Sequence, residues 1–243
     1  MISTCVVANW NVEWVTPRGR RFAAVSDHLC RLNADILCVT EGQLSVLPPG
    51  GFCITSTADY GYQSPNPNRR KVLLWSRNPW REVDTLGSPD LPGGRFVSGV
   101  TETPIGPVKI LGVCIPWRDA HVRTGRKDRL PWQDHTGYLS GLRQLLANCD
   151  AHTAVVGDFN QRIPRKRSPK PVFDELMRTF DGWQIVTAGD LTGTNRPAID
   201  HIALNAGLTA TTVRAWPRAA PDGRRMSDHD GVVAEVTVDN GIG

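Results

Sequence analysis

Several apolar runs in the sequence end, or are interrupted, at a side chain that is costly to bury. These side chains are Asn11 after VVANW, Glu41 after ILCVT, Asp158 and Asn160 after TAVVG, Asp200 within AIDHIALN, and Asp228 with His229 before GVVAEV. Any one of them could be a turn or capping residue, because Asp and Asn side chains bond the backbone after a strand. A desolvated carboxylate, however, must be paired, metal-bound or neutralised. Acids at four such places are too many for one pocket unless a cation compensates them.

The ligand types in this set indicate which cation would fit. The set contains carboxylates and amides, and the six cysteines show no CxxC and no metal-ligand spacing. Hard oxygen ligands favour Mg²⁺ or Mn²⁺ over zinc. Mg²⁺ held by one or two carboxylates keeps water molecules and accepts phosphate oxygens. The set therefore favours a site that acts on a phosphate group.

Basic residues follow the Asp158 motif and recur in three other segments. The segment 162–170 carries five bases and no acid, and further clusters lie in 66–71, 117–129 and 214–225. All four segments are rich in Pro, Gly or polar residues between apolar runs, so we predict loops. The net charge is only +4, and each cluster taken alone could be a solvated surface. The alternative is that the loop after Asp158 holds the phosphate on which Asp158 acts.

The pattern of apolar residues predicts the elements that position these side chains. Apolar residues recur with helical spacing in 22–32, 138–146 and 173–180, and Pro171 is placed to begin the third helix. Short β-branched runs predict strands, and PIGP predicts a hairpin turn between two of them. The runs are CVVANWNV, ILCVTE, FCITST, KVLLWS, RFVSGVTET, VKILGVCI, TAVVGDF, AIDHIALN and GVVAEVTV. Many strands with few helices favour sheet-on-sheet packing with helices outside, in one domain over residues 1–243.

Five short motifs carry a family resemblance. NWN at 9–11, TEG at 40–42, GDFN at 157–160, IDHI at 199–202 and SDH at 227–229 occur in the order and rough spacing of the endonuclease/exonuclease/phosphatase superfamily, the DNase I-like fold. GDFN after a valine run and SDH before the last strand are the specific signals. The resemblance implies an α/β fold, a four-layer sandwich of two packed, largely antiparallel sheets flanked by helices. It also implies a phosphoesterase that depends on a divalent metal.

The resemblance assigns a role to each motif residue. Glu41 resembles the principal metal ligand for Mg²⁺ or Mn²⁺, with Asn11 and Asp228 beside it. Asp158 resembles the carboxylate that orients or deprotonates the attacking water, and whether it or His229 is the base stays open. The other roles that the resemblance implies are phosphate binding for Asn160, orientation of His229 for Asp200, and phosphate contact with a share of the acid–base work for His229.

One position departs from the family pattern. The strand before GDFN usually offers a His or Tyr to the phosphate, and VKILGVCIPW places Cys114 there. A thiol is a poor hydrogen-bond donor to phosphate. Arg118 or a base of the 162–170 loop would then take over the contact, or the activity would be weak.

The basic loops favour a polyanionic substrate, since each neutralised phosphate adds salt-dependent affinity. We predict a nuclease that hydrolyses phosphodiester bonds of DNA, before RNA, by metal-assisted in-line attack of water, and we expect a cytoplasmic monomer without a membrane partner. The predicted substrate-binding residues are Arg118, Arg162, Arg165, Lys166 and Arg167. Two alternatives stay open: a small-molecule or lipid-headgroup phosphatase or phosphodiesterase of the inositol phosphate or nucleotide type, and a catalytically impaired nucleic-acid-binding module.

Overall fold

Two six-stranded sheets pack face to face in the computed structural model, which describes residues 3–63 and 66–239. The first sheet has the strand order β11-β12-β1-β2-β4-β3, and the second has the order β5-β6-β7-β8-β10-β9. The pairings of β1 with β2 and of β7 with β8 are parallel, and the other named pairings are antiparallel. The predicted pair of largely antiparallel sheets is therefore confirmed.

The strands of the first sheet are β1 (Cys5–Asn11), β2 (Ile36–Gln43), β3 (Phe52–Thr55), β4 (Arg69–Ser76), β11 (Leu208–Trp216) and β12 (Gly231–Val238). Those of the second are β5 (Trp80–Asp84), β6 (Phe96–Thr103), β7 (Gly106–Cys114), β8 (Thr153–Asp158), β9 (Gln184–Ile185) and β10 (Asp200–Leu204). The helices are α1 (Phe22–Arg31), α2 (Gln133–Leu146) and α3 (Lys170–Thr179), with a short 3₁₀ helix, η1 (Leu44–Val46).

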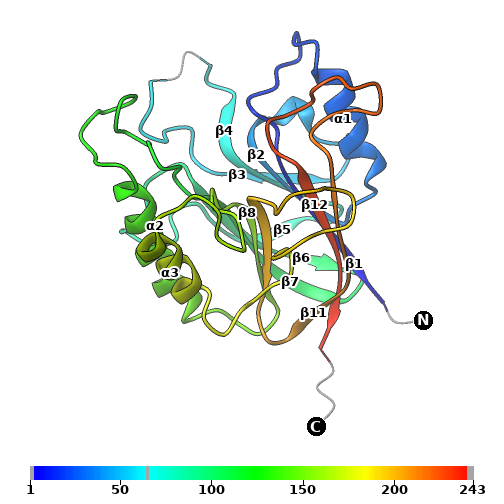
Figure 1. Cartoon of the computed structure of the whole chain (residues 1–243). Helices are drawn as coiled ribbons and strands as arrows, with labels where there is room; N and C mark the ends of the chain where they lie inside the picture. The colour runs from blue at the N-terminus through cyan, green and yellow to red at the C-terminus, as the bar shows by residue number, and fades with distance from the viewer. Residues whose placement is uncertain (1–2, 64–65, 240–243) are drawn as a thin grey trace.

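Three apolar clusters give the molecule four layers. One cluster fills the space between the sheets and includes Cys38 of β2 and Val156 of β8. A second joins α1 to the outer face of the first sheet, and a third joins α2 and α3 to the outer face of the second. Figure 1 shows α1 on one side of the paired sheets and α2 with α3 on the other. This is the predicted four-layer sandwich. No helix in the described residues is long and apolar enough to cross a membrane.

All three predicted helices and all nine predicted strand runs are present, and Pro171 lies in the first turn of α3. Three of the four segments predicted as loops are partly wrong. Arg69, Arg70 and Lys71 begin β4, because their backbone continues the ladder with β2. The start of 214–225 belongs to β11, an edge strand rich in Thr that pairs with β12 and has no clear apolar alternation. Lys170 is the first residue of α3 rather than the end of a loop.

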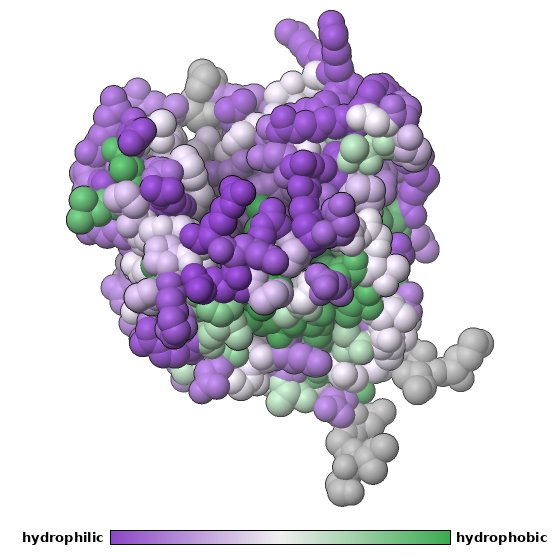
Figure 2. Space-filling model, in the orientation of Figure 1, coloured by the Kyte–Doolittle hydropathy of each residue, from purple (hydrophilic) through white to green (hydrophobic). Residues whose placement is uncertain are grey.

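Hydrophilic side chains gather on the upper side of the molecule, over the loops that connect the strands (Figure 2). The segments after β1, before β4, after β7 and between β11 and β12 lie on this side in Figure 1. The upper side is therefore where the polar residues at the strand ends meet the basic segments.

Two glycines offer a test of this packing. A Cβ at Gly231 would overlap the indole of its cross-strand partner Trp216, which in turn packs on Trp10. We expect Gly231→Ala to lower the free energy of unfolding by about 1–3 kcal/mol, as overpacking does. Gly137, in the middle of α2, has no atom within 4 Å of an added Cβ. Gly137→Ala should instead raise the free energy of unfolding by about 0.5–1 kcal/mol. Urea denaturation measures both, and the same sign for the two variants would contradict the packing.

Candidate active site

The inward faces of β1 and β8 end in polar residues that meet across the two sheets. Side chains alternate along a strand, so Asn9 and Asn11 share the inner face with Val7. The Asn11 amide donates to Asp158 Oδ2 at 3.0 Å, and the Asn9 amide donates to the Gly157 carbonyl at 2.8 Å. The two asparagines thus join the sheets at the point where the apolar core ends.

Three residues lie side by side at the same edge of the second sheet. Cys114 is the register partner of Asp158 on one side, and Asp200 is its partner on the other. All three are buried, with exposures of 1%, 1% and 0%. Two carboxylates in adjacent strands with no solvent contact need compensating charge or hydrogen bonds.

Asp158 obtains its hydrogen bonds from two amides and a backbone group. Asn160 N donates to Oδ1 at 2.8 Å, and the Asn160 side-chain amide donates to Oδ2 at 3.0 Å. Burial raises the pKa of Asp158 to about 7, with the nearby carboxylates of Asp200 and Glu41 adding to the shift and His229 opposing it. A carboxyl group with this pKa exchanges a proton near neutral pH, which is the property of an effective general base or acid.

Asn160 itself is fixed by the same contacts. Its side-chain amide also donates to the Ile115 carbonyl at 2.8 Å, so both of its N–H donors are used within the protein. Its φ of +53° is unusual for a residue other than glycine. In this geometry the amide holds the Asp158 carboxylate in place.

His229 and Asp200 form a tight buried pair. His229 Nδ1 donates to Asp200 Oδ2 at 2.5 Å, while the Asn9 amide lies 3.4 Å from Asp200 Oδ1. Burial disfavours the imidazolium, but Asp200 and Asp158 outweigh it and raise the pKa of His229 to about 10. The Nδ1–H bond to Asp200 leaves Nε2 as the ring nitrogen that can face a substrate.

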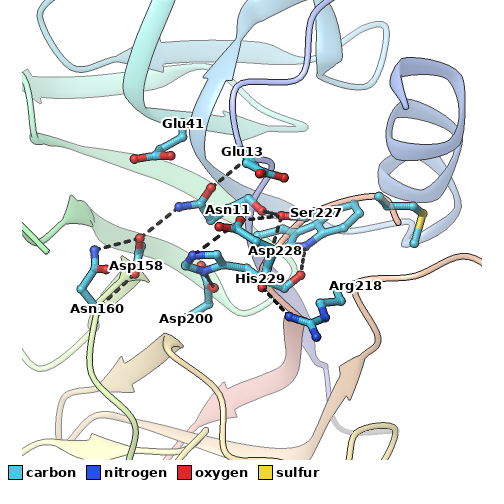
Figure 3. A network of polar contacts seen from close by, with 12 residues as sticks. Asn11, Glu13, Glu41, Asp158, Asn160, Asp200, Arg218, Ser227, Asp228 and His229 are labelled. Atoms are coloured by element: carbon cyan, nitrogen blue, oxygen red, sulfur yellow. Dashed lines mark hydrogen bonds and ion pairs between the residues drawn. The ribbon is translucent and has the colours of Figure 1, made fainter. Parts of the chain in front are cut away.

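The SDH motif is hydrogen-bonded to the end of β1. Ser227 Oγ donates to the Asn11 carbonyl at 2.6 Å and accepts the His229 backbone N–H at 3.2 Å. The Trp10 indole N–H donates to the His229 carbonyl at 3.0 Å. These bonds place His229 opposite Asp158, as Figure 3 shows. Ser227 was not among the predicted site residues, although the SDH motif contains it.

Glu41 faces the same space and is bonded to Lys71. The pairs Thr40–Val72 and Gly42–Arg70 put Lys71 opposite Glu41 in the sheet, and Lys71 Nζ lies 2.5 Å from Glu41 Oε1. Burial alone would raise the pKa of Glu41, but the charge and hydrogen bond of Lys71 lower it below its usual value. Glu41 has a φ of +52°, and such strain in a residue other than glycine is typical of functional sites.

These residues line a cavity of about 240 Å³. Its walls are Asn11, Glu41, Lys71, Arg95, Trp117, Asp158, Asn160, Asp228 and His229. Lys71 and Arg95 were not predicted as site residues. Lys71 could have been recognised as a charged residue at the start of the KVLLWS strand, whereas Arg95 has no signal beyond its place before the FVSGV strand.

Arg95 stands beside Cys114. Its Nη1 lies 3.4 Å from the Cys114 carbonyl and 4.0 Å from Sγ, and its Nη2 is buried without a hydrogen-bond partner among the described residues. Burial raises the pKa of Cys114 to about 12, so the thiol carries no charge at neutral pH. The cationic group at this corner of the cavity is therefore Arg95.

The predicted substrate-binding bases lie outside the cavity walls. Arg118 is exposed and lies 3.5 Å from Asp119. Arg162 donates to the Pro197 carbonyl, and Arg165 donates to the Ser168 carbonyl at 2.9 Å. Lys166 and Arg167 are exposed. Their role in substrate binding stays a prediction.

The donor atoms suit a hard divalent cation. Glu41, Asp228 and the side-chain oxygen of Asn11 are oxygen donors of the kind that such a cation prefers. Asp158, Asp200 and His229 have ligating atoms within 4.8 Å of one another. The short Nδ1–Oδ2 bond leaves no room for an ion between His229 and Asp200.

Comparison with known proteins identifies the family of the chain. The model of the Endonuclease/Exonuclease/phosphatase family matches residues 8–229. The chain therefore belongs to this family of nucleases and phosphoesterases, whose members are hydrolases. No curated protein matches the chain.

Solved structures share the fold at low sequence identity. A 3′ phosphatase, NExo, from Neisseria bound to a product DNA hairpin is 19% identical, with a TM-score of 0.66 over 95% of this chain and 98% of that one. An AP endonuclease from Archaeoglobus fulgidus is 16% identical, with a TM-score of 0.69 and the same coverage of the two chains, 95% and 98%. A humanized D. rerio TDP2 is 13% identical, with a TM-score of 0.67 over 96% and 99%.

The pair of His229 and Asp200 gives a prediction in pH. The Asp200 carboxylate is the largest of the groups that raise the pKa of His229, so Asp200→Asn should lower that pKa. The ¹⁵N shifts of the wild-type ring should report an imidazolium up to about pH 9, whereas the variant ring should be neutral above about pH 7. The pKa of His229 is higher in the folded than in the unfolded protein. Its contribution to the free energy of unfolding is therefore fully present below the unfolded pKa of 6.5 and is lost as pH rises through about 10. Identical titrations of the two rings would contradict the assignment.

Proposed function

We propose that this protein is a metal-dependent phosphodiesterase that hydrolyses DNA by in-line attack of water. The observation that carries the proposal is the cavity in which Asp158, the His229–Asp200 pair, Lys71 and Arg95 converge. It combines a proton acceptor with several cations, which is what phosphoryl transfer to water requires. The basic loop after Asp158 supports a polyanionic substrate, and similar folds include a phosphatase bound to DNA.

Each side chain in the cavity has a part in this mechanism. The Asp158 carboxylate accepts a proton from the attacking water, and Asn160 and Asn11 hold it in the required orientation. The His229 imidazolium, fixed by Asp200, offers its Nε2–H to a phosphoryl oxygen and offsets the charge that develops there. Asp158 is assigned as the base because its pKa lies near neutrality while that of His229 is about 10.

Glu41, Asn11 and Asp228 would hold a divalent cation, Mg²⁺ or Mn²⁺. When bound, the ion supplies charge for the phosphoryl oxygens and orients the substrate. Lys71 is bonded to Oε1 of Glu41, so Oε2 would be the oxygen offered to the ion. Arg95 takes the phosphate contact that the sequence had left to Arg118 or a loop base, because its buried Nη2 has no partner among the described residues.

Glu41→Gln tests the metal assignment. We expect turnover to fall by orders of magnitude and Mn²⁺ affinity in isothermal titration to fall at least about tenfold. The melting temperature should also fall, because the buried Lys71 loses its charged partner. Glu13→Gln is the control, since Glu13 pairs with Arg21 and Arg225 and does not line the cavity. Wild-type turnover in Glu41→Gln, or activity that EDTA leaves unchanged, would rule out this metal site.

The basic loop tests the substrate class. Changing Arg165, Lys166 and Arg167 to Gln should weaken binding to long DNA and flatten its log–log salt dependence by up to about one unit per lost phosphate contact. Hydrolysis of bis-p-nitrophenyl phosphate, which is too small to reach the loop, should barely change.

A control variant removes the same charge elsewhere, at Lys109, Arg143 and Arg178. Arg143 and Arg178 pair with Glu175 on the helical layer, and Lys109 lies near the far end of β7 from Cys114. An unchanged salt slope in the loop variant would remove the main support for DNA. A loss confined to an inositol phosphate would indicate a small-molecule phosphatase.

A further inference from the structure

A second cavity, of about 370 Å³, opens beside the catalytic cavity. The two cavities share Glu41, Lys71 and Trp117 in their walls. The other walls of the second cavity include Trp14, Tyr60, Tyr62 and Arg69. A group bound in the second cavity would therefore lie next to the phosphate group in the catalytic cavity.

The aromatic walls of this cavity are held in place. The rings of Trp14 and Tyr60 are stacked at 5.6 Å with an interplanar angle of 23°. Tyr62 stacks on His121 at 4.4 Å, and its hydroxyl accepts the His121 backbone N–H at 3.0 Å. Trp14 has a φ of +54° and donates its backbone N–H to the Glu41 carbonyl at 2.7 Å. Trp14 is thus bonded to the backbone of the strained site residue Glu41.

Trp117 differs from the other rings. It is 45% exposed, in contrast to the buried Trp10, Trp75 and Trp216. Within the described part of the chain its indole has no ring or cation partner. A large apolar ring left open at the junction of two polar cavities is a free stacking surface.

The charges around the aromatic walls define what could stack there. Arg69 lies 5.0 Å from the Trp14 ring centre, and Lys71 lies 4.9 Å from Trp14 and 5.4 Å from Tyr60. Glu41 is the acid of this cavity, and Lys71 is already bonded to it. The cavity therefore suits a planar ring attached to an anion, and its volume is within the usual range of roughly 300–1,000 Å³ for ligand sites.

We propose that this cavity binds an unpaired base of the nucleotide next to the reacting phosphate, stacked on Trp117. The inference rests on the proposed nuclease function and specifies its substrate. A base in a duplex already stacks on its neighbours on both faces, so only a single-stranded, frayed or extruded nucleotide can enter. Base–aromatic stacking tolerates all four bases, so the cavity selects for an unpaired nucleotide rather than for a sequence.

The test uses an end-labelled, single-stranded oligothymidylate and a version with one abasic residue at a central position. Product lengths give the cleavage rate at each bond. In the wild type, one of the two bonds that flank the abasic residue should be cleaved about tenfold more slowly than the same bond in the intact strand. Annealing the intact strand to oligoadenylate should slow cleavage by a similar factor.

Trp117→Ala should cleave the intact strand about tenfold more slowly and should no longer distinguish the abasic strand from it. Its affinity for the strand, measured by fluorescence anisotropy in EDTA, should fall by a similar factor. Phe52→Ala, at a ring that is 47% exposed on β3 and outside both cavities, is the matched control and should behave as wild type. Equal cleavage on both sides of the abasic residue in the wild type, or an undiminished difference in Trp117→Ala, would overturn the inference. A wild type that cleaves no oligonucleotide but hydrolyses an inositol phosphate would instead overturn the proposed function, and the base site with it.

Discussion

The burial of two adjacent carboxylates, Asp158 and Asp200, is the constraint on which the rest of the site depends. Neither has solvent contact, and both have a raised pKa because burial disfavours the charged form. Such a pair can persist only with a cation and hydrogen-bond donors in contact with it. His229 is that cation, and Asn9 and Asn11 bring donors from the opposite sheet. The side chains that join the two sheets at this edge are thus the ones that stabilise the buried carboxylates. The site therefore depends on the packing of the two sheets.

The cavity is also nearly balanced in charge before any ion or substrate enters it. Glu41, Asp158 and Asp228 face Lys71, Arg95 and His229 across the same walls. A phosphate group would add negative charge and a divalent cation would offset it. We therefore expect binding of either one to strengthen binding of the other. Glu41 is bonded to Lys71 through Oε1 alone, so the same carboxylate could contact an ion through Oε2. The strained backbone at Glu41 fixes its carboxylate at this junction.

The layers and the polar strand ends were predictable because both depend on local patterns. Alternation along VVANWN places Asn11 on the inner face, and GDFN and SDH mark the ends of neighbouring segments. Arg95 and Lys71 were not recognised as site residues, because their placement depends on which strands become neighbours and in what register. A basic residue next to an apolar run is most often solvated, and nothing local distinguishes these two from the exposed Arg118. The β11 strand was missed for a related reason, since an edge strand with one partner needs little apolar alternation.

In the proposed mechanism Arg95, rather than a base of the loop, compensates for the thiol at Cys114. The Cys114 thiol is neutral and buried, so it takes no part in the charge balance of the cavity. The Arg95 guanidinium lies beside it, with Nη1 3.4 Å from the Cys114 carbonyl. Burial raises the pKa of Asp158 to about 7, and the Asp200 and Asp158 carboxylates raise that of His229 to about 10. Between these two pKa values Asp158 is ionised and His229 is protonated. In the proposed mechanism Asp158 must be ionised to accept a proton from water, and His229 must be protonated to offer its Nε2–H to the phosphoryl oxygen. Both conditions hold only in this pH range.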